Sequence, residues 1–171
     1  MAHHDDEEFA EYFAAKRDSV RRTAYLLCGD WHRADDLAQT AFVSLHRKWR
    51  KIRDRRAVDA YLRKTLARAA IDESRRPWRR EEHTDEVPQP RVADDGDALA
   101  ERVSARADLL AGLARVPSKQ RAVLVLRYFE GLDVASVARA LGCSEGNVKS
   151  QTARGLAKLR TALGEEVGTH G

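Results

Sequence analysis

Residues 142–160 read GCSEGNVKSQTARGLAKLR, a turn-forming cluster that leads directly into a basic helix with spaced leucines. Gly142 stands where a turn between two helices would require a positive φ, which glycine adopts without strain. Ser144 is a typical N-cap residue for the helix that follows. This helix could lie in a DNA groove, or it could be an ordinary amphipathic helix.

The residues around the turn favour a helix-turn-helix motif. Val137 and Leu141 are apolar at helical spacing, and Ala138 is small where the two helices would cross. Val148 returns to the core from the second helix, whose outward face is polar and partly basic and therefore suits a major groove. The candidate DNA contacts in this motif are Ser144, Asn147, Lys149, Ser150 and Arg154. In the alternative, a helical hairpin, the charged face would meet only water, and Thr152 stands where an apolar residue is expected.

Apolar residues recur every three or four positions through most of the chain, and alternating, strand-like runs are nearly absent. This pattern predicts an all-α protein. One apolar stripe runs over 34–49 and another over 61–69, with Asp54 as a plausible cap for the second helix. An earlier helix, or a bent pair of helices, is expected over 9–27. The three stripes could together support a small helical bundle.

The stretch 77–97 differs from its surroundings, because it holds three of the four prolines and many charges but no helical stripe. We interpret it as a flexible linker. The chain then divides into a first helical domain over 1–76, a second helical domain over 98–163 and a tail over 164–171. In the second domain Pro117 fits the start of a helix. The expected inner face of that helix consists of Val123, Leu124, Leu126, Tyr128 and Phe129.

The net charge is only +4, but positive and negative charges are segregated along the chain. Residues 47–80 carry a net charge of +10 and residues 115–160 a net charge of +6, with a net charge of −6 over 81–114 between them. A solvated surface needs no such segregation, whereas two separate contacts on a polyanion would benefit from it. The charge pattern therefore favours two contacts with nucleic acid.

Several function classes find no support in the sequence. No run of about 18 apolar residues exists, and the acidic start MAHHDDEEF is unlike a signal peptide. Cys28 and Cys143 lie far apart and lack metal-binding spacing, so we expect a reduced, cytoplasmic protein without a metal or cofactor. No Ser/His/Asp set or Walker loop is present, so we do not expect an enzyme.

Four stretches together resemble a known family. They are ADDLAQTAFVSLHRKW (34–49), AYLRKTLARAAIDESRR (60–76), VPSKQRAVLVLRYFEGLDVASVARALGC (116–143) and NVKSQTARGLAKLR (147–160). Their order and spacing are similar to those of the two conserved regions of extracytoplasmic-function (ECF) sigma factors in the sigma-70 family, SigE-like branch. The resemblance covers about residues 9–76 and 98–163. It implies a promoter-specificity subunit of bacterial RNA polymerase.

The resemblance also implies a division of labour. The first domain, region 2, would dock on the β′ clamp helices of core RNA polymerase and open the minus-ten element of promoter DNA. The second domain, region 4, would read the minus-thirty-five element and sit on the β flap. An anti-sigma factor is a further candidate partner, and no membrane contact is expected.

Candidate residues for these contacts follow from the same resemblance. The clamp-binding helix would contribute Asp35, Asp36, Gln39, Thr40, Phe42 and Leu45. The strand-opening segment would contribute Tyr61, Lys64, Arg68, Asp72, Arg75 and Arg76. In region 4, Arg121 matches a phosphate-contacting position, and Lys149, Ser150 and Arg154 match contacts of the recognition helix.

Some of these residues have a second interpretation. Asp35 and Asp36 fit the first turn of a helix, where negative charge suits the helix dipole. Phe42 fits the apolar stripe of the same helix. Arg68 stands where the family often has Asn, and Ala153 stands where some relatives carry a larger side chain. The resemblance therefore leaves the preferred promoter sequence open.

The alternative function is a free-standing transcriptional regulator that uses the helix-turn-helix motif as a dimer. Such a regulator would need a dimerisation or ligand-sensing domain in its N-terminal half. This chain instead has an acidic helix followed by a basic one, which favours the sigma factor.

Overall fold

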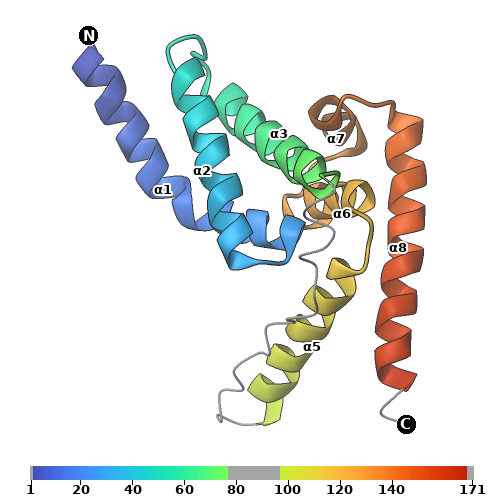
Figure 1. The fold of residues 1–171 in the computed structure, drawn as a ribbon. Coiled ribbons are helices and arrows are strands. Elements are labelled where there is room, and N and C mark those ends of the chain that lie inside the picture. The colour runs from blue at the N-terminus through green and yellow to red at the C-terminus, as the bar shows by residue number, and fades with distance from the viewer. Residues whose placement is uncertain (1, 77–96, 169–171) are drawn as a thin grey trace.

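Helices make up all the regular structure in residues 2–76 and 97–168, which are the residues that the computed structural model describes (Figure 1). In chain order they are α1 (Ala2–Cys28), α2 (Trp31–Lys48), α3 (Arg55–Ser74), α5 (Asp97–Ala114), α6 (Ser118–Leu124), η1 (Val125–Phe129), α7 (Val134–Leu141) and α8 (Glu145–Gly168). The predicted all-α fold is confirmed. The predicted linker lies outside the described residues except for Asp97, and α8 extends beyond residue 163, where the second domain was expected to end.

Local capping residues set the ends of the first three helices. Gly29 has a φ of 77°, so it ends α1 in the left-handed conformation that glycine tolerates. Asp30 caps α2, and its Oδ1 accepts a hydrogen bond from the backbone N–H of His32 at 2.7 Å. Asp54 caps α3, as predicted, by accepting a hydrogen bond from the backbone N–H of Arg56 at 3.1 Å. Two short connections thus fix the directions of α2 and α3.

The helices α1, α2 and α3 form a bundle with an apolar centre, and we call this bundle the first unit (Figure 1). The predicted apolar stripes face one another inside it. The most enclosed side chains include Ala24, Leu27, Ala34, Leu37, Ala41, Leu45, Val58, Leu62 and Leu66. Burying each large apolar side chain stabilises the fold by roughly 1.5–3 kcal/mol, so these contacts dominate the stability of the unit.

Two expected polymerase contacts belong to this core. Leu45 is fully buried, with an exposed fraction of 0%, and it cannot touch a partner while the bundle is folded. Phe42 is 5% exposed, and its ring meets that of Phe13 edge to face with centroids 4.8 Å apart. Phe42 therefore packs in the bundle as its place in the apolar stripe indicates, and Leu45 is enclosed in the core.

The helices α5 to α8, with η1, form the second unit, and its α7–turn–α8 segment has the predicted helix-turn-helix geometry. Asp133 caps α7 by accepting a hydrogen bond from the backbone N–H of Ser136 at 2.7 Å, which lowers the pKa of the Asp133 carboxyl group. Gly142 ends α7 with a φ of 66°. The Ser144 Oγ then accepts a hydrogen bond from the backbone N–H of Asn147 at 3.0 Å. The predicted turn glycine and the predicted cap are both confirmed.

Between α6 and α7 the chain widens into a π-helix, η1. The backbone N–H of Glu130 donates to the carbonyl of Val125 at 3.0 Å, a bond that spans five residues instead of four. The wider turn changes which side chains face inward. Tyr128 is 56% exposed and Phe129 is 47% exposed, so the expectation that both fill the inner face of this helix is wrong.

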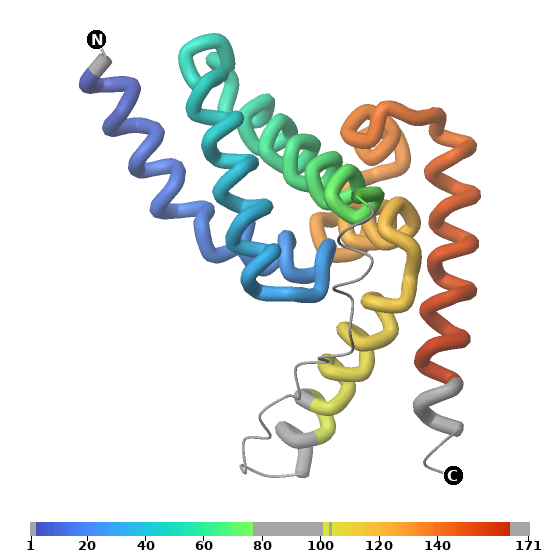
Figure 2. Tube along the Cα trace, in the orientation of Figure 1, coloured from blue at the N-terminus to red at the C-terminus, as the bar shows by residue number. Residues whose placement is uncertain are grey.

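The two units pack directly against each other (Figure 2). Helix α3 lies against α6 and α7, and α1 touches α5, α6 and η1. One continuous apolar cluster contains Leu66 and Ile71 of α3 together with Val116 and Leu124 of the second unit. A second cluster joins Ala67 of α3 to apolar residues of α6, η1, α7 and α8. The sequence predicts two helical domains but contains no local signal of this contact.

Leu45→Ala should lower the free energy of unfolding by roughly 2–5 kcal/mol, because it leaves a cavity in an enclosed core. Urea denaturation followed by circular dichroism measures this change. Val43→Ala is the matched control on the same helix, since Val43 is 45% exposed. The control should shift the unfolding free energy by no more than about 0.5 kcal/mol. Small effects of similar size for both variants would contradict the core position of Leu45.

Candidate nucleic-acid and partner interfaces

The second helix of the helix-turn-helix motif, α8, presents an open polar face. Lys149, Ser150, Ala153 and Arg154 are exposed, whereas Val148 on the opposite side is fully buried. These exposed side chains can reach phosphates or base edges, because neither Lys149 nor Arg154 forms an ion pair within residues 2–76 and 97–168. The helix therefore offers a contact face that is available without rearrangement.

Two other candidates near the start of α8 contribute mainly to local structure. Ser144 uses its Oγ to accept the capping hydrogen bond from Asn147. The Asn147 side chain is turned inward, and its Oδ1 is buried without a hydrogen-bond partner among the described residues. Ser144 stays exposed while its hydroxyl group serves the cap, whereas the amide oxygen of Asn147 is turned away from solvent. The direct candidate contacts are thus concentrated one turn further along α8.

Thr152 occupies the inner edge of α8 where an apolar residue was expected. Its side chain is 6% exposed, and its hydroxyl group donates to the carbonyl of Val148 at 2.7 Å. This bond satisfies the hydroxyl group within the helix and leaves the methyl group to pack in the core. Threonine therefore substitutes for an apolar residue here without an unsatisfied polar atom.

The candidate strand-opening residues share one side of α3 and its C-terminal end. Their spacing of three or four residues places Tyr61, Lys64, Arg68 and Asp72 in one row, and Arg75 and Arg76 follow at the end of the helix. Asp72, Arg75 and Arg76 are exposed. The structure brings these six residues to a common face that is mainly basic.

Tyr61 and Lys64 are partly held within this row. The Tyr61 hydroxyl group and the Ser44 hydroxyl group lie 2.7 Å apart and share a hydrogen bond, which ties the ring to α2. The Lys64 Nζ lies 5.9 Å from the centre of the Tyr61 ring, within the range of a cation–π contact. An aromatic ring beside a cation is a suitable platform for an unstacked base and its phosphate.

The Arg68 side chain forms a hydrogen bond with the second unit. Its Nε donates to the backbone carbonyl of Ala140, near the C-terminal end of α7, at 2.9 Å. Carbonyl groups in the last turn of a helix have no partner within the helix and carry partial negative charge, so they attract a guanidinium group. In this arrangement the guanidinium group is held by protein and its Nε is not available to DNA.

Arg121 was expected to contact a phosphate, and the structure places it elsewhere. Its guanidinium group donates to the carbonyl groups of Leu27 at 3.0 Å, Ala114 at 2.7 Å and Val116 at 2.9 Å. Burial lowers the pKa of Arg121 from its ordinary value. The side chain is occupied by the ends of α1 and α5, so Arg121 acts as a structural residue in this arrangement.

A groove of about 850 Å³ lies between α1 and α2. Its apolar wall consists of Phe9, Phe13, Phe42 and Val43, and its rim carries carboxylate and guanidinium groups. Phe13 is 38% exposed and Val43 is 45% exposed, so apolar surface remains open to solvent. An apolar wall with a charged rim is typical of a site that binds a protein partner.

The predicted polymerase-binding residues divide into three groups around this groove. Asp35, Gln39 and Phe42 line it. Asp36 and Thr40 are exposed on α2 but do not line the groove, and Leu45 is buried beneath it. Helix α2 begins at Trp31, so Asp35 and Asp36 lie beyond its first turn, and their alternative role as first-turn charges is wrong.

An aromatic and charged cluster holds Asp35 at the rim. Arg21 on α1 donates from Nε to Asp35 at 2.6 Å, and its guanidinium carbon lies 4.3 Å from the centre of the Trp31 ring. Trp31 in turn stacks on Tyr25 with ring centroids 4.0 Å apart. Stacking on one side and an ion pair on the other restrict the rotamers of Arg21. The carboxylate of Asp35 is therefore presented in a defined position.

Sequence reasoning missed Phe13 and Val43 as candidate partner contacts. Phe13 falls within the apolar spacing that predicts the first helix over 9–27, and such spacing identifies an apolar face but not its exposed edge. Val43 follows Phe42 directly and falls outside the apolar stripe of α2. An apolar residue out of phase with the buried stripe of its helix was the signal that could have identified it.

The described part of the chain contains neither a candidate membrane span nor a candidate metal-ligand cluster. Among the helices in residues 2–76 and 97–168, none is both long and apolar enough to cross a membrane. The same residues contain no group of three or more His, Cys, Asp or Glu side chains that could hold a metal ion.

Comparison with known proteins gives two family matches and several relatives. The model of Sigma-70 region 2 matches residues 13–80, and the model of Sigma-70, region 4 matches residues 106–159. The RNA polymerase sigma-E factor of Streptomyces avermitilis is 39% identical, with 95% of this chain and 89% of that protein covered. The sigma-E factor of Streptomyces coelicolor is 38% identical, with 91% and 86% covered. The ECF RNA polymerase sigma factor SigM of Mycobacterium tuberculosis is 33% identical, with 91% and 77% covered.

A solved structure has a similar fold. It is the sigma factor RpoE in complex with the anti-sigma factor NepR from Bartonella quintana, with a TM-score of 0.68 and 21% identity. The similarity covers 92% of this chain and 97% of that chain. It supports the arrangement of helices described above.

Arg121→Gln should lower the free energy of unfolding by about 1–3 kcal/mol, because the carbonyl groups of Leu27, Ala114 and Val116 lose a charged donor. Urea denaturation measures this change. The salt dependence of DNA binding should stay as in the wild type, since the side chain makes no phosphate contact. Arg106→Gln, on the exposed surface of α5, is the charge-matched control. Unchanged stability together with a weaker salt dependence would instead support the phosphate contact.

Proposed function

The chain belongs to the sigma-70 family of RNA polymerase sigma factors, in the ECF group, and from this premise we propose a role for each of its two units and for the groove. A sigma factor binds core RNA polymerase and directs it to specific promoters. The observation that carries this conclusion is that region 2 and region 4 both match, in that order, on one chain. The alternative, a free-standing dimeric regulator, does not account for region 2.

The first unit is the proposed minus-ten reader. Its exposed row on α3 combines basic side chains with the partly exposed ring of Tyr61. Opened promoter DNA presents single-stranded phosphates together with unstacked bases, which are bound well by cations beside an aromatic ring. We assign the contacts to Tyr61, Lys64, Arg68, Asp72, Arg75 and Arg76.

The second unit is the proposed minus-thirty-five reader. Lys149, Ser150 and Arg154 project from α8 on the side opposite the buried Val148 and Thr152. A helix with this pattern fits the major groove, where lysine and arginine bind phosphates or guanine edges. We assign Ser144 to the cap that positions this helix.

The groove between α1 and α2 is the proposed docking site for the β′ clamp helices. Its rim carries both carboxylates and guanidinium groups, so it can pair with charges of either sign on a partner helix. In its apolar wall, Phe13 and Val43 can contact apolar side chains of the partner. Asp35 and Gln39 line the same groove, while Asp36 and Thr40 extend the contact along α2.

A second apolar surface is available for the polymerase on the other unit. Tyr128 and Phe129 project from η1 and are both about half exposed. Large aromatic side chains in solvent are characteristic of protein interfaces. We assign this pair to the β flap. An anti-sigma factor is a further proposed partner. Core RNA polymerase and promoter DNA, the two proposed partners in transcription, place the chain in the bacterial cytoplasm.

Run-off transcription with core RNA polymerase over a promoter library tests the function directly. The wild-type chain should direct initiation at promoters that core polymerase alone ignores. Val43→Asp should abolish this activity and the co-elution with core polymerase, because it places an unpaired carboxylate in the apolar wall of the groove. Ala15→Asp, on the exposed surface of α1 outside the groove, is the matched control and should retain both.

Two results would count against this assignment. Normal association of the Val43→Asp variant with core polymerase would remove the groove from the clamp contact. No initiation by the wild-type chain, together with tight binding of a palindromic operator by the chain alone, would favour the dimeric regulator.

Lys149→Ala combined with Arg154→Ala should weaken binding to minus-thirty-five DNA and reduce its salt dependence. Each lost phosphate contact lowers the logarithmic slope by about 0.9, so the slope should fall by up to roughly 1.8. Titration of labelled duplex at several salt concentrations measures it. Arg102→Ala combined with Arg106→Ala removes the same charge from α5 and should leave most of the slope intact. An equal fall in both variants would indicate only a general charge effect.

A further inference from the structure

Ser44 is a partly buried polar residue of α2 that none of the proposed contacts includes. It directly follows Val43, which lines the groove, and directly precedes Leu45, which is fully buried. Ser44 does not line the groove itself; its Oγ lies 2.7 Å from the hydroxyl oxygen of Tyr61 on α3, and the two groups share a hydrogen bond. Because the enclosed Leu45 fixes the backbone beside it, Ser44 presents its hydroxyl group to Tyr61 from a rigid position.

This hydrogen bond holds the Tyr61 ring at both ends. One end of the side chain is the Cα in α3, and the other is the hydroxyl oxygen bonded to α2. A side chain held only at its Cα can move among staggered rotamers, whereas one that is also bonded through its tip keeps a single direction. The bond therefore restricts the χ1 angle of Tyr61. It also fixes where the Lys64 Nζ, 5.9 Å from the ring centre, lies relative to the ring.

The second unit does not seal this held ring. Tyr61 is partly exposed and borders a cavity of about 480 Å³ between α3 and α7. Lys64 and the apolar side chains of Ile52 and Ala57 line the same cavity. A ring that is anchored at its tip, lies beside a cation and borders open space can stack on a planar group without first changing its rotamer.

We propose that Ser44 is a positioning residue for the minus-ten element, because its hydroxyl group fixes the Tyr61 ring in the orientation that stacks on one unstacked base. The inference rests on the proposed function of the α3 row, in which Tyr61 is assigned to the DNA. Ser44 itself touches no DNA. Since the ring is held before DNA arrives, stacking does not have to offset a loss of rotamer freedom. Alanine at position 44 would leave the ring mobile and weaken the binding of that base.

Single-stranded oligonucleotides that carry the minus-ten element test this role, with the chain in complex with core polymerase. In a series of probes, each position in turn lacks its base but keeps its phosphate. Loss of the base that stacks on Tyr61 should weaken wild-type binding by roughly 10-fold or more. Ser44→Ala and Tyr61→Phe should each weaken binding of the intact probe by about 2–10-fold. The probe without the stacked base should bind the wild type and both variants equally.

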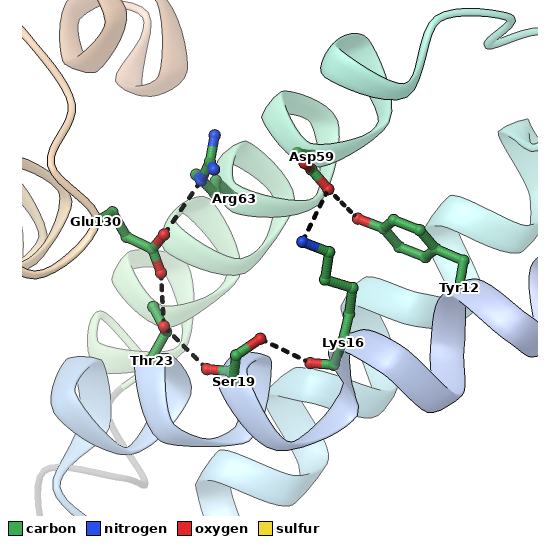
Figure 3. Close-up of polar contacts among 7 residues, drawn as sticks. All are labelled: Tyr12, Lys16, Ser19, Thr23, Asp59, Arg63 and Glu130. Atoms are coloured by element: carbon green, nitrogen blue, oxygen red, sulfur yellow. Dashed lines mark hydrogen bonds and ion pairs between the residues drawn. The ribbon is translucent and has the colours of Figure 1, made fainter.

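A double variant and a matched control sharpen the comparison. Ser44→Ala combined with Tyr61→Phe should bind no more weakly than either single variant, because both changes remove the same bond. Tyr12→Phe is the control. Its hydroxyl group also joins two helices of the first unit, since it donates to Asp59 of α3 at 2.6 Å, but it lies outside the candidate DNA-binding row (Figure 3). The control should lower the free energy of unfolding and leave the pattern of losses along the probe series unchanged.

The possible results distinguish a positioning role from a purely structural one. A loss of affinity in Ser44→Ala that is equal for every probe overturns the proposal, because reduced stability does not depend on which base is missing. Additive losses in the double variant overturn it as well. Failure of Ser44→Ala to co-elute with core polymerase also overturns it, since the hydroxyl group would then serve the groove. A wild-type complex that binds every base-free probe as well as the intact one counts against the proposed function of the α3 row instead.

Discussion

Helix α3 is packed from two directions, and most other features of the molecule depend on this. One flank, including Leu62, completes the core of the first unit, while Ala67 belongs to a cluster of the second unit. Leu66 and Ile71 lie in a cluster that contains residues of both units. The candidate DNA-binding row lies on the same helix as these two apolar contacts. Movement of the second unit would therefore change the surroundings of the row, since Arg68 in it donates to Ala140 of α7.

Local rules predicted most of the fold, because most of it is determined by neighbours in sequence. The cap at Asp54, the turn at Gly142 and the cap at Ser144 each involve groups a few residues apart, and all three have the expected geometry. The helix-turn-helix motif was predictable for the same reason. Helical spacing also identified most buried positions. What spacing cannot identify is the surface against which a buried residue packs.

The less predictable features all involve groups far apart in the sequence. Arg121 matches a DNA-contact position of the family, yet its guanidinium group meets a carbonyl 94 positions earlier in the chain. Leu45 was assigned to a partner by resemblance although its spacing already placed it in the apolar stripe. In both cases the physical environment of the side chain, rather than its residue type, determines its role. Where periodicity and resemblance disagreed, as for Leu45, periodicity was correct.

The π-helix η1 makes the contact between the two units depend on the number of residues in this short segment. A π-helix holds one residue more than an α-helix of the same extent, and each residue of an α-helix turns the chain by about 100°. The Glu130 carboxylate, which follows η1, accepts hydrogen bonds from Thr23 on α1 and Arg63 on α3 (Figure 3). Losing that one residue would rotate Glu130 away from both partners. A single-residue deletion within η1 would therefore loosen the contact between the two units without changing any side chain of α8.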